Sequence, residues 1–212
     1  MSKKNKDFNE NYTHCCDCKK VSIKQFQGSF IGESIESKKE FAEIIDFYIF
    51  KAPILKDSKN ENDFGLTSLS KLGWHGNGGL GRLESELKSK ANITLYFIRS
   101  DRINNTVSAM NLDDNICIEH ARGVLKQNYS ITVKENGEKI LSNSESRMLC
   151  LFRHIRNSLA HGRTYTFDNG YILLDDIEGN GILSARLLIK LSDLHEWIYI
   201  ILNPPTDLYM KK

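Results

Sequence analysis

The chain has 212 residues, with 29 lysines and arginines against 27 aspartates and glutamates, for a formal net charge of +2. This balance excludes a histone-like polycation and gives no support to a long electrostatic clamp for nucleic acid. Any contact with RNA or DNA must therefore come from a local group of side chains. The length favours one domain with elaborations over two full domains.

No stretch of the sequence approaches the ~20 apolar residues that a membrane helix needs. The basic residues at the start of the chain are not followed by the apolar core of a secretory signal. Five cysteines, an odd number, indicate reduced thiols rather than a disulfide framework. We therefore expect a cytoplasmic protein with no membrane association.

Three cysteines and a histidine crowd together near the start of the chain, at His14, Cys15, Cys16 and Cys18. A structural zinc site needs four converging ligands, whereas Cys15 and Cys18 form one correctly spaced pair with no second pair downstream. We interpret residues 1–20 as a flexible leader with incidental thiols and residues 21–212 as a single domain. No metal and no cofactor is expected.

The first predicted helix begins with a capping box of Ser37 and Glu40 and ends at Pro53. A glycine-rich segment, 73–82, then leads into a short amphipathic helix. Backbone N–H groups at 76–81 can cradle phosphate, but no buried strand precedes the glycines and no Gly-Lys-Ser/Thr follows them. A flexible helix entry is the favoured interpretation, and nucleotide binding is the alternative.

The middle of the chain has mixed signals. Residues 93–98 fit a strand or a buried helical segment, since periodicity does not separate the two. Residues 116–127 are predicted to be helical. Residues 129–133 and 139–141 are predicted to form a β-hairpin, because Asn-Gly at 136–137 favours a tight turn.

The most regular segment is a predicted motif helix over about 143–162, capped by Ser142 with Glu145 and ended by Gly162. Its predicted apolar stripe consists of Met148, Phe152, Ile155 and Leu159. Three strands separated by glycine-containing turns should follow as a β meander over about 164–190. A last helix is predicted over about 193–202, before two prolines stop it.

Cations and histidines gather in the last turns of the motif helix, in the run Arg153-His154-Ile155-Arg156-Asn157-Ser158-Leu159-Ala160-His161-Gly162-Arg163. Cations at a helix C-terminus interact favourably with the helix dipole, which accounts for Arg163 and in part for His161. Asn157 and His161 share one face of the helix. Arg156 lies about 140° from His161 around the axis. Two copies packed about a two-fold axis would complete a composite site, which predicts a homodimer.

The run Arg156-Asn157-x-x-x-His161, followed by Gly162, resembles the R-x4-6-H motif of HEPN domains. Over roughly residues 142–202, the chain is similar to a plasmid-borne HEPN subfamily linked to toxin and antiviral defence roles. The resemblance implies a mostly α fold, a HEPN-like helical bundle with a small antiparallel β-hairpin and meander as an insertion. It also implies a dimeric, metal-independent endoribonuclease with RNA as its substrate.

The chemistry of the residues agrees with RNA cleavage, because RNA carries its own nucleophile, the 2′-OH, next to each phosphate. His161 suits a general acid or base, and Arg156 offers a fork to phosphate oxygens. Asn157 would orient His161 or bond the substrate. These three are the candidate catalytic residues, and Arg153 and Arg163 are the candidate substrate-binding residues.

The alternative hypothesis is a non-catalytic HEPN module that dimerises or binds a nucleotide or a partner protein. A nucleic-acid-binding regulator ranks third, because the chain lacks a basic stripe and a helix-turn-helix. The resemblance to toxins raises a neutralising or regulatory protein as a further partner. Some HEPN toxins carry a partner-modified tyrosine two residues after the motif histidine, and Arg163 in that position argues against this control. His154 is interpreted as a solvated or packing residue.

Overall fold

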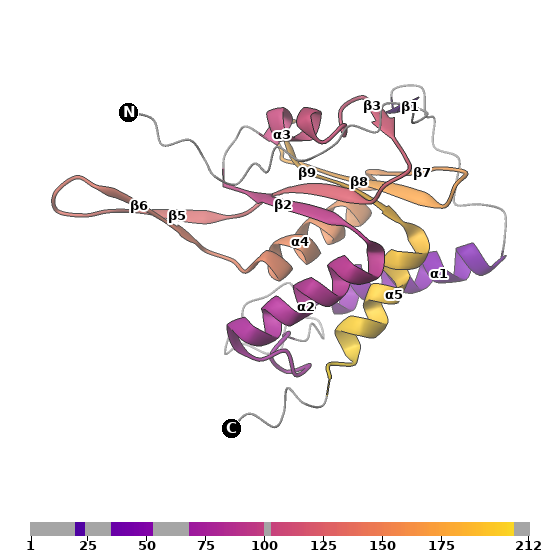
Figure 1. Ribbon diagram of the computed structural model, residues 1–212, viewed down its shortest axis with the longest axis horizontal. Helices are drawn as coiled ribbons and strands as arrows, with labels where there is room; N and C mark the ends of the chain where they lie inside the picture. Colours follow the sequence, from indigo (N-terminus) through magenta and orange to yellow (C-terminus); the bar gives the residue numbers. More distant parts are fainter. Residues whose placement is uncertain (1–19, 24–34, 53–67, 100–102, 206–212) are drawn as a thin grey trace.

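A mixed α/β fold is formed by residues 20–23, 35–52, 68–99 and 103–205, which the computed structural model describes (Figure 1). The main sheet has five strands in the order β2-β4-β9-β8-β7. β2 and β4 are parallel, and the other neighbours are antiparallel. The strands are β2 (Thr94–Ile98), β4 (Arg122–Lys126), β7 (Thr164–Thr166), β8 (Tyr171–Ile177) and β9 (Leu183–Lys190).

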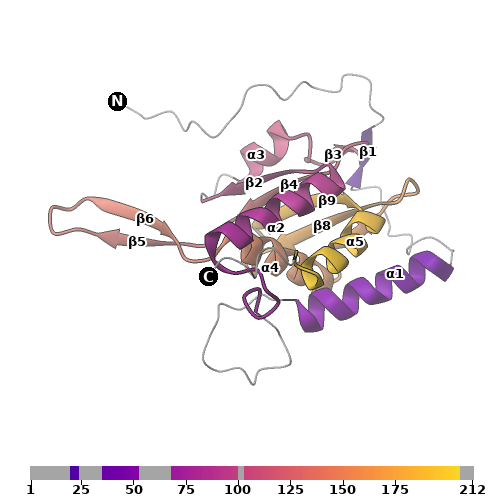
Figure 2. The ribbon, with the colours of Figure 1, turned by 60° about the horizontal axis from the view of Figure 1, so that its bottom comes forward.

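Most of the helices form one layer against this sheet, and α3 (Ile103–Ala109) lies on the opposite face (Figure 2). The small sheet of β1 (Lys20–Ser22) and β3 (Asn115–Cys117) lies on the same side as α3. The helical layer consists of α1 (Ile35–Ile45), its π-helical continuation η2 (Asp46–Lys51), α2 (Gly76–Ala91), α4 (Arg147–Ala160) and α5 (Leu191–Leu202).

Two buried tryptophans join α2 to α5. The indole N–H of Trp74, just before α2, donates to the carbonyl of Ile201 at 2.8 Å, and that of Trp197 on α5 donates to the carbonyl of Leu87 at 3.0 Å. Both rings are almost fully buried. Each ring therefore fills the core with its apolar surface while its one polar atom is satisfied.

The glycine-rich segment forms the beginning of α2 rather than a loop. Gly76 has a φ of +60°, a conformation in which a side chain is strained. A Cβ on Gly79 would lie 2.9 Å from the carbonyl carbon of Trp74. Packing against Trp74 and the local backbone therefore explain these two glycines without a bound phosphate.

The predicted fold class, a mostly α HEPN-like bundle with a small β insertion, is wrong. Residues 116–127, predicted to be helical, contain β3 and β4 instead. The predicted meander is antiparallel as expected, but β7, β8 and β9 belong to the main sheet rather than to an insertion. Central strands covered on both faces become apolar throughout and lose the period-two pattern, so the sequence does not separate them from buried helices.

Several element boundaries follow the prediction and others shift. Gly162, with a φ of +63°, ends α4 as expected. The true N-cap is Ser146, whose hydroxyl accepts a hydrogen bond from the Leu149 N–H at 3.2 Å. Ser142 instead lies in a strand, because the hairpin of β5 (Tyr129–Val133) and β6 (Lys139–Asn143) is longer than predicted.

The ends of the chain were also predicted differently. α1 begins at Ile35, so Ser37 lies within the helix rather than at its cap, and α5 begins at Leu191 rather than near residue 193. Pro53, the His14–Cys18 group and residues 1–19 of the leader proposed over 1–20 lie outside the described residues, whereas Lys20, its last residue, belongs to the strand β1. Across the described part of the chain, every helix is too short or too polar to span a bilayer.

Arg122, at the start of β4, is 2% exposed and holds the α3–β3 side of the sheet together. Its guanidinium donates to four backbone carbonyls, those of Met110, Asn111, Cys117 and His120, at distances of 2.6 to 2.9 Å. The carbonyls of Met110 and Asn111 directly follow α3. One side chain therefore satisfies carbonyls from the end of a helix and from the β3–β4 connection.

We expect Arg122→Met to lower the free energy of unfolding by about 3 kcal/mol or more, because it leaves several buried carbonyls without donors. Urea denaturation at neutral pH measures the change. Arg82→Met is the matched control, since Arg82 forms a partly exposed i,i+4 pair with Glu86 and should cost about 0.5 kcal/mol or less. Equal effects of the two substitutions would contradict the role of Arg122.

Candidate functional site

The motif helix α4 packs its apolar side into the core between β8 and η2. The predicted apolar stripe is confirmed, since its members are all buried: Met148, Phe152, Ile155 and Leu159. With this side fixed, the orientation of every other residue of α4 follows from the helical period. The polar residues of the last three turns divide into an inward group and an outward group.

His154 leads the inward group, and its imidazole pairs with Asp176 on β8. His154 is 2% exposed and Asp176 is 5% exposed. The His154 Nδ1 lies 2.7 Å from the Asp176 Oδ2, and the Nε2 lies 2.8 Å from the carbonyl oxygen of Lys126. Both ring nitrogens therefore lie against oxygen atoms, and the ring joins the Asp176 carboxylate to the end of β4.

Arg153 lies beside this pair and is itself neutralised. Its guanidinium binds Glu145 through two hydrogen bonds, of 3.0 Å from Nε and 2.7 Å from Nη2. The same Nη2 donates to the Lys126 carbonyl at 3.1 Å and lies 3.2 Å from the His154 Nε2. A closed cluster is thus formed by Arg153, Glu145, His154 and Asp176, and Arg153 is not available to a phosphate in this arrangement.

The carboxylates of the cluster are held in their charged form. Burial alone would raise the pKa of Asp176, but hydrogen bonds from His154 and Asn157 and the nearby positive charges outweigh it and lower the pKa. Burial alone would also raise the pKa of Glu145. There, hydrogen bonds from Arg153 and from the Asn128 N–H lower the pKa. Acid should therefore weaken the cluster.

The adjacent Cys150 is also buried, and its thiol donates to the Lys126 carbonyl at 3.5 Å. Desolvation, followed by the charge of Glu145, raises the pKa of this thiol well above its usual range. Such a cysteine stays protonated and is a poor nucleophile. Cys150 is therefore a packing residue.

Asn157 belongs to the inward group as well. Its amide donates to the Asp176 Oδ2 at 3.1 Å, so the same oxygen accepts from Asn157 and from His154. The sequence placed Asn157 on the face of His161, but no hydrogen bond joins their side chains in the described part of the chain. Asn157 instead fixes α4 to β8, one turn before the exposed end of the helix.

Arg156 and His161 form the outward group. His161 caps the C-terminus of α4, its side chain is exposed, and no described residue forms a hydrogen bond or ion pair with its imidazole. Arg156 is half-buried, and its Nε donates to the carbonyl of Ile49 on η2 at 3.4 Å. No described group bonds the two terminal nitrogens of Arg156. Nor does a contact join Arg156 to His161 within one chain.

Arg163 is turned back onto the protein, where its Nη1 donates to the carbonyl of Ile177. Its backbone N–H donates to the Ser158 carbonyl at 2.9 Å, and its carbonyl accepts from the Asp175 N–H at 3.0 Å. Of the five predicted site residues, the structure therefore engages Asn157, Arg153 and Arg163 in internal contacts. Arg156 and His161 keep polar atoms available.

Sequence reasoning missed Asp176 and Glu145 as partners of the motif helix. The available signal was Asp175-Asp176 within an otherwise apolar strand, since buried carboxylates require partners. His154 was interpreted as either a solvated or a packing residue, and the structure shows the second, since its side chain is buried. Among the described residues, no three His, Cys, Asp or Glu side chains form a group that could hold a metal ion.

Asp176→Asn tests the central pair through its pH dependence. A depressed carboxyl pKa contributes stability above the pKa of the unfolded chain, near 4, and this contribution is lost as the pH falls through that region. We expect the substitution to lower stability at pH 7 by about 3 kcal/mol, because it removes the charged acceptor of two buried hydrogen bonds, from His154 and from Asn157. The remaining stability should fall less steeply in acid than that of the wild type.

Urea denaturation between pH 7 and pH 3 measures both effects. Asp168→Asn, at an exposed position in the turn before β8, is the control and should retain the wild-type slope. If the stability of Asp176→Asn falls in acid as steeply as that of the wild type, then protonation of Asp176 is not what destabilises the protein at low pH.

Comparison with known proteins identifies no relative: no family model matches the chain, and neither a curated protein nor a solved structure matches it significantly.

Proposed function

We propose that this protein is a metal-independent endoribonuclease of the HEPN type that acts in toxin or antiviral defence systems. The observation that carries the proposal is the end of α4, where an exposed imidazole, His161, follows a guanidinium, Arg156, whose two terminal nitrogens bond no described residue. An imidazole that can exchange a proton and guanidinium nitrogens that can bind phosphate are what the 2′-OH cleavage of RNA requires.

The chemistry assigns one role to each residue. His161 removes the proton from the 2′-OH or delivers a proton to the departing 5′ oxygen. The attack of the 2′ oxygen on phosphorus leaves a 2′,3′-cyclic phosphate and a free 5′-OH. Arg156 binds the non-bridging phosphate oxygens and stabilises the charge that grows on them in the transition state.

The inward cluster supports this assignment indirectly. His154, Asp176 and Asn157 hold the last turns of α4 against β8, so the outward pair projects from a fixed helix end. Functional groups that project from a rigid element keep their geometry better than groups on a loop. The buried free thiols of Cys117 and Cys150 agree with a reducing cytoplasmic setting.

A composite site in a homodimer explains why Arg156 and His161 do not meet within one chain. The two residues are separated by about 140° around the helix axis. A two-fold axis near the C-terminal end of α4 would bring Arg156 of one chain toward His161 of the other. Each dimer would then hold two equivalent sites.

The first test of function is cleavage of a mixture of structured and unstructured RNAs in the presence of EDTA. We expect His161→Ala and Arg156→Ala each to reduce the rate by about 10²-fold or more, because general acid–base and charge-stabilising groups contribute at least that much. The products should carry 2′,3′-cyclic phosphates.

Two substitutions serve as matched controls for the cleavage assay. His120→Ala removes an exposed histidine from the β3–β4 connection, and Arg147→Ala removes an exposed arginine from the first turn of α4. Both variants should cleave at the wild-type rate. Undiminished cleavage by His161→Ala and Arg156→Ala would refute the site, and loss of wild-type activity in EDTA would refute the metal-free mechanism.

The composite arrangement makes a separate prediction for mixed chains. When His161→Ala and Arg156→Ala chains are unfolded together and refolded at equal amounts, half of the dimers are mixed, and each mixed dimer has one intact site. We therefore expect recovery of about one quarter of the wild-type activity. A site within one chain would give no recovery, because every site would carry one defect.

A further inference from the structure

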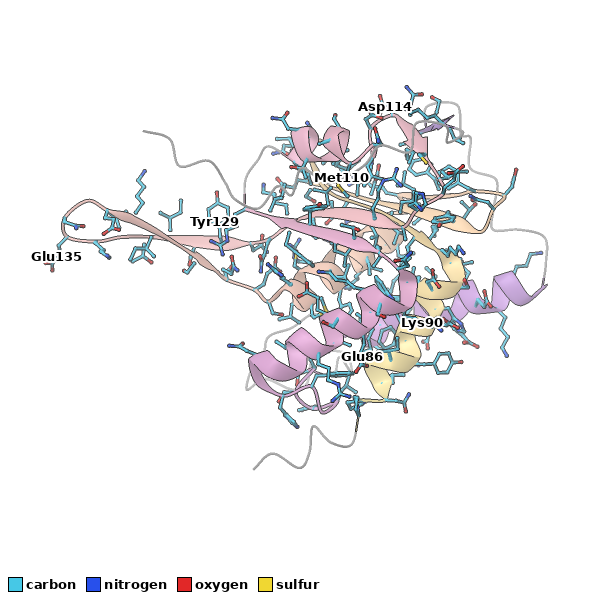
Figure 3. The ribbon with its side chains drawn as sticks, in the orientation of Figure 1. Glu86, Lys90, Met110, Asp114, Tyr129 and Glu135 are labelled. Carbon is cyan, nitrogen blue, oxygen red and sulfur yellow. The ribbon has the colours of Figure 1, made fainter. Side chains whose placement is uncertain are left out.

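The hairpin of β5 and β6 forms an arm that projects away from the body of the molecule (Figure 1). Tyr129 lies at the base of the arm and Glu135 at its tip (Figure 3). Within the described chain, each of the two strands pairs only with the other. A two-stranded ribbon without further support is marginally stable in water. Pairing with a further strand would therefore stabilise the arm.

The free edge of β5 has a defined pattern of backbone groups. The Lys134 N–H donates to the Glu138 carbonyl at 2.8 Å, and the Asn128 carbonyl accepts from the Ser144 N–H at 3.0 Å. Inward and outward backbone groups alternate along an antiparallel strand, so even-numbered residues bond β6. The odd-numbered residues direct their N–H and C=O groups away from β6: Tyr129, Ile131 and Val133.

The same three residues place their side chains on one face of the ribbon. Ile131 is 53% exposed and Val133 is 58% exposed, which is unusual for large apolar side chains on a strand. The arm carries two lysines, at positions 134 and 139, and two glutamates, at positions 135 and 138, so its net charge is zero. A neutral apolar arm does not attract a phosphate backbone and is suited to a protein surface.

We propose that the partner of the arm is a second copy of this chain, which pairs its β5 with the first β5 in antiparallel orientation about a two-fold axis at Ile131. In this register, Ile131 faces Ile131 of the second copy, Tyr129 faces Val133, and Ser130 faces Thr132. Aromatic–β-branched and hydroxyl–hydroxyl pairs are favourable across strands, and no like charges are opposed. The strand is therefore complementary to itself.

The pairing also removes the weaknesses of the isolated arm. It joins two ribbons into a four-stranded sheet, which reaches the size at which a β-structure becomes independently stable. The outward N–H and C=O groups of both β5 strands bond each other, so two open edges are closed. The three apolar side chains from each copy form one continuous stripe across the axis.

This interface is separate from the proposed composite active site and does not rest on the ribonuclease proposal. The arm joins α4 at its N-terminal end, whereas His161 caps the other end of this 14-residue helix, about 20 Å away. The arm alone would give a dimer. Both two-fold interfaces together would give a tetramer with D2 symmetry.

Light scattering on the full chain tests the arm interface. Ile131→Lys places two like charges opposite each other at the axis, and we expect it to halve the mass of the assembly, whether the wild type is a tetramer or a dimer. Ile182→Lys makes the same change at an exposed position between β8 and β9 and should leave the mass unchanged. Circular dichroism checks that both variants fold.

A wild type that remains a single 24.3 kDa chain at micromolar concentration would overturn the proposal. So would an Ile131→Lys protein with the wild-type mass. An Ile131→Lys protein that keeps its mass but loses binding to RNA would overturn it in favour of RNA as the occupant. RNA cleavage is measured on the same samples. The mass of the assembly tests the arm and the cleavage rate tests the ribonuclease proposal, so each proposal can fail without the other.

Oxidative cross-linking tests the register. Residues facing each other in a hydrogen-bonded antiparallel pair have Cα atoms about 5.5 Å apart, within the range of a disulfide. Ile131→Cys chains should therefore form a disulfide between their introduced thiols, identified by mass spectrometry of the linked peptide. Thr132→Cys, whose thiol faces Ser130 of the second copy, is the matched control and should not. Efficient linking of Thr132→Cys without linking of Ile131→Cys would overturn the register.

Discussion

The buried hydrogen-bonded pair of His154 and Asp176 is the interaction on which the arrangement of the motif helix depends. It joins α4 to β8, and the other ring nitrogen, 2.8 Å from the Lys126 carbonyl oxygen, joins both to the end of β4. An unpaired charge at this depth would cost several kcal/mol. Asn157 accordingly adds a second hydrogen bond by donating to the same carboxylate oxygen.

The division of the motif into two sides follows from this constraint. Arg153 is adjacent to His154 and must itself be neutralised, which Glu145 does with two hydrogen bonds. The residues on the other side of the helix face no such requirement. Arg156 and His161 therefore retain the hydrogen-bonding capacity that the proposed reaction needs, and their substitution would leave the cluster intact.

Arginine acts largely as a structural residue elsewhere in this fold. Arg122 satisfies four carbonyls, Arg163 bonds a carbonyl of β8, and Arg186 forms a two-pronged pair with Asp175 at 2.8 and 2.6 Å. These guanidinium groups contribute to the formal charge but are already engaged.

Local features of the chain could be predicted where one or two residues dictate the backbone. Asn136-Gly137 specified the hairpin, and Gly162 with a positive φ specified the end of α4. The apolar stripe of α4 was also predicted correctly. The N-cap of α4 was predicted four residues too early, because the spacing of Ser142 and Glu145 matches a capping box. In the structure, Ser142 belongs to the strand β6, which pairs with β5.

The sequence by itself determined the turns, the amphipathic side of the motif helix and the position of the Arg156/His161 pair at its end, because these depend on contacts within a few residues. Tertiary structure alone decided that residues 122–126 form the strand β4 and that β4 and β2 join the predicted strands β7, β8 and β9 in one five-stranded sheet, since a strand buried on both faces, as β4 is, has no periodicity to show it. It also decided which motif residues are free. His154 and Asp176 are 22 positions apart, and only the packing of α4 on β8 brings them together. The same packing directs Asn157 to Asp176 rather than to His161, and no described residue bonds the His161 imidazole or the terminal nitrogens of Arg156.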